Sequence, residues 1–179
     1  FSTRLDDKSF IITPYMKDRK YLEVSEIVRI ENGKKEAGKM PSRSVLLHQY
    51  IYQKHPHIHS VIIAHPHNIM VFAVTDETFD SRTIPESYIL LRNIPKLPFG
   101  SSFMQPAMVA DLFIQKCPIV LVENDCIIVT GSSLLNAFDR LEVAEFSAKA
   151  LIASKSLGEV ISINDRQVAE IEKAFHLAH

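Results

Sequence analysis

Between Ile119 and Ser154 the sequence passes from two short apolar runs into one long amphipathic repeat. The runs Ile119–Val122 and Ile127–Val129 are rich in β-branched residues, which favours buried strands. Gly131-Ser132-Ser133 follows, and serine caps the start of many helices. The repeat then spaces its apolar residues by three or four, as a helix with one face on a core does: Leu134, Ala137, Phe138, Leu141, Ala144, Ala148, Leu151 and Ile152. Two strands that lead into a long one-sided helix predict a sheet covered by that helix.

The rest of the chain repeats this alternation of short strands and helices. Asn68–Val74 is a short apolar run that fits either type, and we favour a helix. Pro95 in Ile94–Leu97 marks the edge of a sheet, because proline cannot donate to a strand ladder. Asn32-Gly33 is a hairpin signal. The further predicted strands are Phe10–Thr13, Glu26–Glu31, Ile58–Ala64 and Pro85–Leu91, and the further predicted helices are Ser44–Lys54, Pro106–Lys116 and Asp165–Leu177. Interleaving of this kind predicts an α/β or α+β domain.

The composition fits one globular domain and excludes several classes of protein. The 179 residues are 46% hydrophobic and 23% charged, so we expect a single domain over residues 1–179. A formal net charge of −1 gives no global attraction to nucleic acid or to a membrane surface. No apolar run approaches the ~20 residues of a membrane span.

The two cysteines bear on the compartment of the protein, and the first residue bears on the length of its natural chain. Cys117 and Cys126 are too few for a disulfide framework and fit a reducing compartment. The sequence shows no signal peptide and no targeting tail, so we expect a cytoplasmic protein. Because the first residue is Phe1 and not Met, we expect the natural chain to extend further upstream.

Several segments, in order along the chain, resemble the class II aldolase/adducin family. The first four residues, FSTR, resemble the end of its glycine-asparagine loop, and Ile11-Ile12-Thr13-Pro14 resembles its ITP strand end. Residues 39–52 resemble its helix of pattern KxPSxE followed by LHxxIY, and His65-Pro66 follows at the family's spacing. Residues 123–131 resemble its NHGxxxxG strand pair, and residues 137–145 its last long helix. The resemblance covers residues 1 to about 155.

This resemblance implies a three-layer α/β/α fold, with a central, mostly antiparallel sheet and helices on both faces. The family's N-terminal helix would lie upstream of Phe1. Many members are homotetramers with active sites between subunits. The implied activity is that of an aldolase-type lyase acting on a small sugar phosphate such as L-fuculose 1-phosphate. In the family, three histidines bind a divalent metal, usually Zn²⁺, which polarises the substrate's oxygens, and a glutamate acts as acid and base.

The sequence departs from the family at these positions. Ile63 stands at the first histidine position, His65 matches the second, and Asp125 stands at the third. Ser44 stands where the family has its glutamate.

The positions that bind the substrate's phosphate in the family match only in part. Ser42 matches the family, and Arg43 replaces a serine but is able to bind phosphate bidentately. Tyr15 and Met16 replace small residues near the ITP turn.

Two interpretations of the metal site follow. In the first, His65, His67 and Asp125 rebuild a site for Zn²⁺ or another divalent ion, since both histidine and aspartate are ordinary ligands and His-x-His is a ligand spacing. Glu86 is then a candidate for the lost acid, with a solvated glutamate at a strand end as its alternative.

In the second interpretation, the metal site is lost. Asp125 is a turn residue, because Asn-Asp favours turns, and Cys126 is a buried, inert thiol. His48 is a packing residue, and His55, His57 and His59 are exposed loop residues. The protein is then a catalytically inactive binding or scaffolding module, as adducin shows the family fold to allow.

Overall fold

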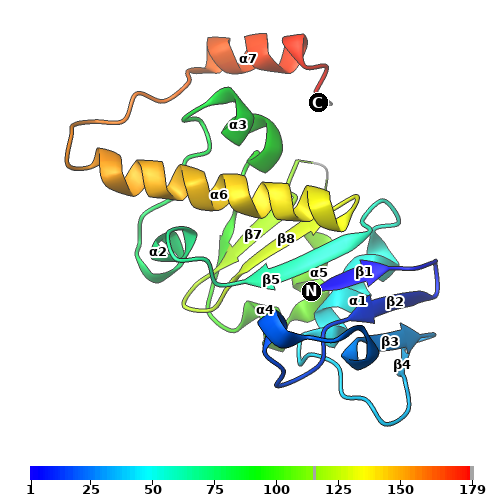
Figure 1. Ribbon diagram of the computed structural model, residues 1–179. Coiled ribbons are helices and arrows are strands. Elements are labelled where there is room, and N and C mark those ends of the chain that lie inside the picture. Colours follow the sequence, from blue (N-terminus) through cyan, green and yellow to red (C-terminus); the bar gives the residue numbers. More distant parts are fainter. Residues whose placement is uncertain (115, 178–179) are drawn as a thin grey trace.

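The computed structural model describes residues 1–114 and 116–177 and has an eight-stranded sheet at its centre (Figure 1). The strands are β1 (Ser2–Arg4), β2 (Ser9–Ile12), β3 (Val28–Glu31), β4 (Lys34–Lys35), β5 (Ser60–Ala64), β6 (Lys96–Leu97), β7 (Ile119–Val122) and β8 (Ile127–Gly131). Their order is β4-β3-β2-β1-β5-β8-β7-β6. Among the described residues, every neighbouring pair is antiparallel except β6 and β7, which are parallel.

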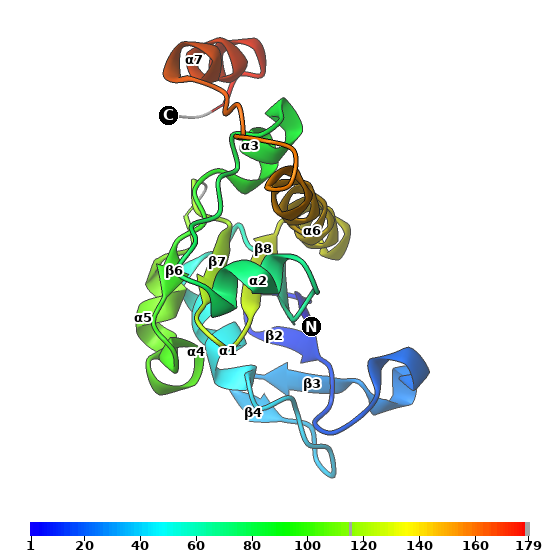
Figure 2. The same cartoon turned by 90° about the vertical axis from the view of Figure 1, so that its left-hand side faces the viewer.

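Helices cover both faces of the sheet, as Figure 2 shows in side view. One face carries α1 (Val45–Lys54), α4 (Ser101–Met104) and α5 (Pro106–Asp111). The other carries α2 (Ile69–Val74), α3 (Pro85–Leu91) and α6 (Leu134–Ser154), and α7 (Asp165–Ala174) packs on α3. Two 3-10 turns, Arg19–Tyr21 and Val24–Glu26, lie between β2 and β3. The three-layer α/β/α arrangement is therefore confirmed.

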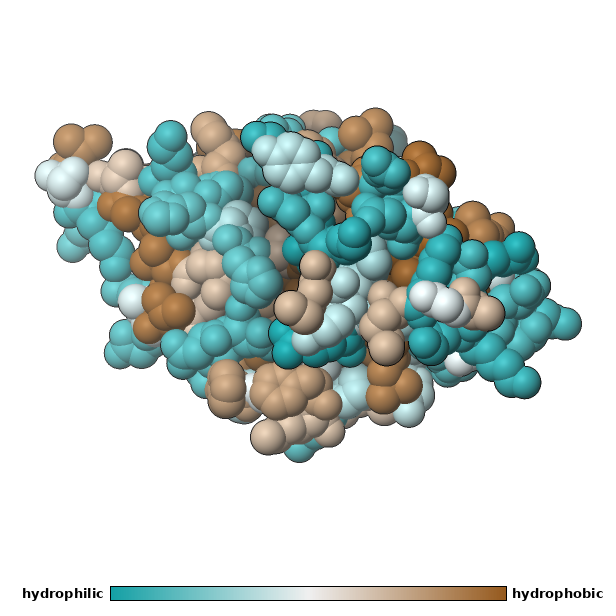
Figure 3. All heavy atoms as spheres, turned by 60° about the horizontal axis from the view of Figure 1, so that its bottom comes forward, coloured by the Kyte–Doolittle hydropathy of each residue, from teal (hydrophilic) through white to brown (hydrophobic). Residues whose placement is uncertain are grey.

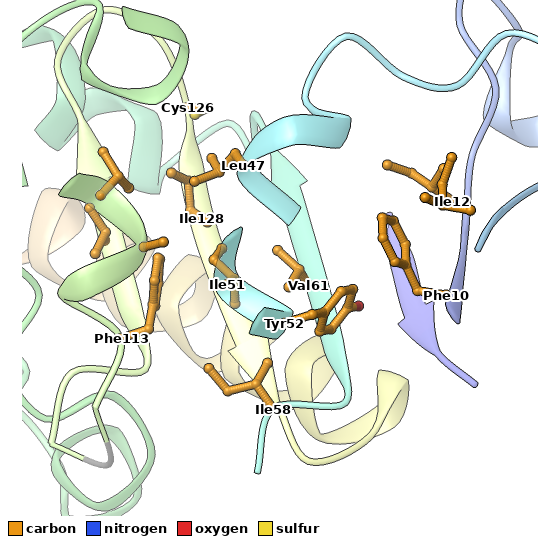
Figure 4. Packing of buried hydrophobic residues seen from close by; sticks show 14 of the residues in the cluster. Phe10, Ile12, Leu47, Ile51, Tyr52, Ile58, Val61, Phe113, Cys126 and Ile128 are labelled. Carbon is orange, nitrogen blue, oxygen red and sulfur yellow. The ribbon is translucent and has the colours of Figure 1, made fainter. Parts of the chain in front are cut away.

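The central strand β5 divides its side chains between two apolar cores. Successive residues of a strand point to opposite faces, so Val61 and Ile63 face α1 while Ile62 and Ala64 face α6. Figure 4 shows the first core, where Leu47 and Ile51 of α1 pack beside Ile128 of β8. Burial of such a side chain stabilises the fold by about 1.5–3 kcal/mol. Because both faces are apolar, β5 reads as a continuous hydrophobic run in the sequence.

The long helix α6 has the predicted bounds but a narrower buried stripe than its sequence pattern indicates. Ala137, Ala144 and Ala148 are fully buried against the sheet. Leu134 and Phe138, predicted on the same face, are 48% and 50% exposed. Alanine lets the helix lie close to β8, so the larger residues on either side of the stripe remain partly in solvent.

Pro85–Leu91 is a helix, and its prediction as a strand was wrong. Pro85 begins α3 after Ile84 in extended conformation, which suits the fixed φ angle of proline. Ser87 and Leu91, four residues apart, are both buried, so the segment buries one face of a helix. Its tyrosine, isoleucine and leucines resemble a strand in composition alone. Glu86 consequently lies exposed in the first turn of α3 and not at a strand end.

Other predicted bounds need smaller corrections. The strand within Ile94–Leu97 is only Lys96–Leu97, and the last helix ends at Ala174. The helix predicted over Pro106–Lys116 ends at Asp111, and Gln115 lies outside the described residues. The helix favoured at Asn68–Val74 is confirmed as α2, and the hairpin at Asn32-Gly33 joins β3 to β4 with both residues at positive φ. Within the described residues, no helix has the length and apolar character needed to cross a membrane.

His48 is fully buried in α1, which agrees with its prediction as a packing residue. Its Nδ1 lies 2.6 Å from the Ser2 hydroxyl, which in turn lies 2.7 Å from the Tyr52 hydroxyl. Its Nε2 is buried with no hydrogen-bond partner among the described residues. Burial holds the pKa of His48 well below its ordinary value, so the folded chain keeps this ring neutral.

We expect the free energy of unfolding to fall as the pH drops below about 6.5. Below this pH the His48 ring binds a proton in the unfolded chain but stays neutral in the folded one. The folded pKa is lowered, so the unfolded state binds more protons in this window and stability rises with pH. One such group contributes up to about 1.4 kcal/mol per pH unit. His48→Asn keeps a hydrogen-bonding group toward Ser2 but does not titrate. Urea denaturation between pH 7 and 5 should show a shallower slope for this variant, and equal slopes would assign the pH dependence to other groups.

Candidate functional site

A cavity of about 620 Å³ lies between the start of α1, the end of β5, the β7–β8 turn and α4. Its polar lining residues come from five separate parts of the chain and include most of the site residues singled out in the sequence: Arg19, Ser42, Arg43, Ser44, His65, Ser102 and Asp125. A cavity of this size with convergent polar groups has the dimensions of a small-molecule site.

The pairing of β5 with β8 brings His65 and Asp125 into this cavity. The ladder runs from Ser60 opposite Gly131 to Ala64 opposite Ile127, so His65 and Cys126 are the next residues beyond its end. Asp125 belongs to the tight β7–β8 turn, where Asn124 has a φ of +50°. Asp125 is thus both a turn residue and part of the cavity wall, and the two interpretations of this residue do not exclude each other.

The Asp125 carboxylate is hydrogen-bonded, and the adjacent Cys126 thiol is buried. The Ser102 hydroxyl of α4 donates to Asp125 Oδ2 through a short hydrogen bond. Burial, and after it the adjacent Asp125 carboxylate, raises the pKa of the Cys126 thiol far above its ordinary value. The thiolate is the form that binds metal or attacks as a nucleophile, so the raised pKa disfavours both roles for Cys126. This agrees with its sequence interpretation as a buried thiol.

The donors present do not fit the three-histidine metal site that the family resemblance implies. Ile63, which the resemblance places at the first ligand position, lines the cavity without any donor atom in its side chain. His65 and Asp125 are two donors, and no third histidine, cysteine or acidic residue of the described chain joins them in a metal-binding group. His67 does not line this cavity; its charge acts instead on Glu145 of α6. Glu86 on α3 does not line it either.

The phosphate positions do form a coherent positive wall. The Ser42 and Ser44 hydroxyls lie 3.0 Å apart at the start of α1, whose first turn contains no acidic residue. The positive end of a helix dipole favours an anion at this point. The Arg43 guanidinium lies 5.4 Å from the centre of the Tyr15 ring, within the range of a cation–π contact.

The contact between Arg43 and Tyr15 joins two departures from the family pattern. By the resemblance each residue replaces a small one, and the ring of Tyr15 supports the Arg43 guanidinium. Tyr15 is also attached to this region through its backbone, whose N–H donates to the Met40 carbonyl at 2.9 Å. The two replacements therefore form a single structural unit beside Ser42.

Arg19 and Ser102 are cavity residues that the sequence did not reveal. Arg19 belongs to a 3-10 turn, and Ser102 is in the four-residue helix α4. Neither lies in a motif or an apolar repeat, so only the tertiary fold brings them to the cavity. Among the described residues, neither Arg19 nor Arg43 forms an ion pair with a carboxylate, which leaves both charges available to an anionic ligand.

Apolar side chains border the same cavity. Phe103 lines it, and the Phe99 ring lies 5.9 Å from the Phe103 ring in an edge-on arrangement. Phe99, Phe103 and Met104 are 61%, 59% and 72% exposed. Figure 3 faces this end of the molecule and shows apolar side chains interrupting the hydrophilic surface.

Comparison with known proteins identifies the family of this fold. Residues 1–152 match the model of the class II aldolase and adducin N-terminal domain. The 3-oxo-tetronate 4-phosphate decarboxylase of Haemophilus influenzae is 24% identical, and the match covers 96% of this chain and 84% of that protein. The structure of YgbL from Klebsiella pneumoniae superposes with a TM-score of 0.81 at 21% identity, over 95% of this chain and 84% of that one. L-fuculose 1-phosphate aldolase gives 0.78 at 23% identity, over 98% and 85%. The chain therefore belongs to the class II aldolase and adducin family.

Proposed function

We propose that this chain binds a small phosphorylated sugar or sugar acid in the cavity at the start of α1. The observation that carries the proposal is the positive wall of Ser42, Ser44, Arg43 and Arg19, in which neither arginine has a carboxylate partner among the described residues. Arginine binds phosphate and carboxylate groups through paired hydrogen bonds. Two arginines fit a ligand with two anionic groups, or one phosphate held from two sides.

The names of the related proteins support this class of ligand. One relative is a decarboxylase of a 4-phosphorylated tetronate, and one similar structure is an aldolase of a 1-phosphorylated sugar. Both names describe a short carbon chain with a terminal phosphate. A cavity of about 620 Å³ is large enough for such a molecule.

A second candidate function is the carbon–carbon lyase activity of the family, on a substrate such as L-fuculose 1-phosphate. One observation favours it: His65 and Asp125, two groups able to bind Zn²⁺, line the same cavity as the phosphate-binding wall. The pair lacks a third donor within the described chain, and the family's glutamate position holds Ser44. We therefore place ligand binding first and derive no reaction step through a metal.

The exposed apolar side chains beside the cavity bear on how copies of the chain assemble. We propose that copies of the chain associate through the exposed Phe99, Phe103 and Met104, next to the cavity. The exposure of these apolar side chains beside the cavity supports the homo-oligomer that the resemblance implies, in which a site lies between subunits.

The test is calorimetric titration with dihydroxyacetone phosphate, with dihydroxyacetone as the matched ligand that lacks the phosphate. We expect the phosphorylated compound alone to bind. Arg43→Ala should weaken its binding at least about tenfold, because a charge-assisted contact is lost. Arg166→Ala, which removes an exposed arginine of α7, should leave the affinity unchanged. Equal binding of both compounds, or equal effects of both substitutions, would contradict the proposed function.

The same titration, repeated with added Zn²⁺, separates the two candidates. If the protein is a ligand-binding module, zinc changes neither the affinity nor the ligand. If it is a lyase, about one Zn²⁺ per chain should bind, Asp125→Ala should abolish that binding, and L-fuculose 1-phosphate should be cleaved to dihydroxyacetone phosphate and lactaldehyde.

A further inference from the structure

A second cavity, of about 400 Å³, lies at the opposite end of the β5–β8 strand pair. The first cavity adjoins the residues beyond Ala64 and Ile127, whereas the second is lined by Thr130, Gly131 and the segment before β5. In Figure 1 the amino-terminal, yellow end of α6 lies on this side, beside the start of β5. The lining residues do not overlap with those of the first cavity.

The charge of this cavity is one-sided. Five basic side chains line it, and its described lining contains no aspartate or glutamate: His57, Arg92, Lys116, Arg140 and His176. Arg92 has a carboxylate neighbour, Glu172 of α7, at 3.5 Å. For Lys116 and Arg140 no ion pair is formed within the described chain. A cavity with walls of one charge sign and low dielectric concentrates ions of the opposite sign.

Arg140 lines this cavity and has a buried hydrogen-bond donor without a partner among the described residues. One terminal nitrogen of its guanidinium donates to the Thr130 carbonyl at 2.6 Å, which fixes the side chain against β8. Its Nε–H is buried and has no acceptor among the described residues. A buried donor without an acceptor is unfavourable, and more so when it is charged. An oxyanion in the cavity would supply the negative charge that the Arg140 guanidinium lacks among the described residues.

The neighbouring elements add to the same positive potential. The first turn of the 21-residue helix α6 contains no acidic residue, and Ser132 and Asn136 from its start line the cavity. His57 also experiences this field: burial first, and then the charges of His55 and Arg140, lower its pKa below the ordinary value. Hydroxyl and amide groups beside the arginine give further hydrogen bonds for an oxyanion.

We propose that this cavity is a second ligand site, which binds a small molecule through a phosphate or similar oxyanion group. Arg140 and Lys116 neutralise the anion, and Ser132 and Asn136 contact its oxygens. The site is independent of the proposed function, because the two cavities share none of their lining residues. A free phosphate ion and a phosphorylated metabolite offer the same group, so the experiment must include both.

Histidine ring NMR on the whole chain tests the proposal, with His57 as the reporter of this cavity and His65 as the reporter of the first. The probes are inorganic phosphate and glycerol 3-phosphate. We expect the His57 signal to move along a saturable curve. Arg140→Gln and Lys116→Gln should each weaken that response about tenfold or more, while the His65 response keeps its midpoint. Tighter binding of glycerol 3-phosphate identifies a metabolite site, and equal binding identifies a site for the free ion.

The matched control is Lys149→Gln, which removes one exposed positive charge from the same helix outside the cavity. It should leave the His57 titration unchanged. The proposal is overturned if the His57 signal does not move with either probe. It is equally overturned if Lys149→Gln weakens the response as much as Arg140→Gln, since that result indicates non-specific attraction. Lys116 is exposed, so its variant reports on the site even where the Arg140 variant is poorly folded.

Discussion

Replacing Gly131 with alanine is expected to lower the free energy of unfolding by about 3 kcal/mol, the upper end of what overpacking costs. A Cβ at this position would lie 2.5 Å from the backbone nitrogen of Ala137 and 2.8 Å from the Ser133 carbonyl oxygen. These are backbone atoms of α6 and its cap, so no side chain can rotate away. The helix would have to move off β8, where Ala137 is fully buried.

Guanidinium denaturation of the variant and the unsubstituted chain measures this effect. Gly38→Ala is the matched control, because Gly38 has a φ of +78° and nothing within 4 Å of an added Cβ. In Gly38→Ala the new residue experiences only the strain of a left-handed backbone, about 1 kcal/mol. A smaller loss for Gly131→Ala than for Gly38→Ala would show that α6 does not approach β8 as closely as the structure indicates.

Glu145→Ala is expected to cost about 2 kcal/mol, because this carboxylate of α6 holds the loop between β5 and α2. It accepts from the Asn68 and Ile69 backbone N–H groups at 2.9 Å each and from the Asn68 side-chain amide at 2.6 Å. Burial alone would raise the pKa of Glu145, but these hydrogen bonds outweigh it and the pKa is lowered. The expected loss of stability is set below the sum of these hydrogen-bond energies because the Glu145 carboxylate is partly exposed to solvent.

The lowered pKa of Glu145 sets the direction in which the stability should change with pH. A lowered folded pKa means that the stabilisation is fully present above the unfolded pKa of about 4.3 and is lost as the pH falls through the folded value. The difference in stability between the two proteins, measured by urea denaturation, should therefore shrink below pH 4. Glu142→Ala removes an exposed glutamate of the same helix and should change stability by less than about 0.5 kcal/mol. Equal losses for the two variants would contradict the role given to Glu145.

The local elements of this fold were predictable where one rule decided the structure. The apolar strands depend on continuous β-branched runs, the α6 repeat depends on helical periodicity, and Asn32-Gly33 depends on turn chemistry. The prediction failed at α3, where tyrosine, isoleucine and leucine favour a strand but packing against α6 and α7 imposes a helix. Tertiary contacts override weak local preference in such short segments.

The candidate site was predictable only in part, because it depends on register and on long-range contacts. Family spacing identified Ser42, Arg43, His65 and Asp125, and the fold places these residues around one cavity. The β5–β8 ladder brings His65 and Asp125 to the same cavity, and neither strand encodes that register alone. The second cavity was not predicted, since its basic residues are scattered from His57 to His176 and form no motif.

The sheet ends on both sides in strands of only two residues, β4 (Lys34–Lys35) and β6 (Lys96–Leu97). A strand at the edge of a sheet exposes unpaired backbone groups, and a long one recruits a strand from another molecule into amyloid-like stacking. Edges this short, with lysine at three of the four positions, offer too few hydrogen bonds and too much charge for that process. Misassembly by strand addition is thereby disfavoured.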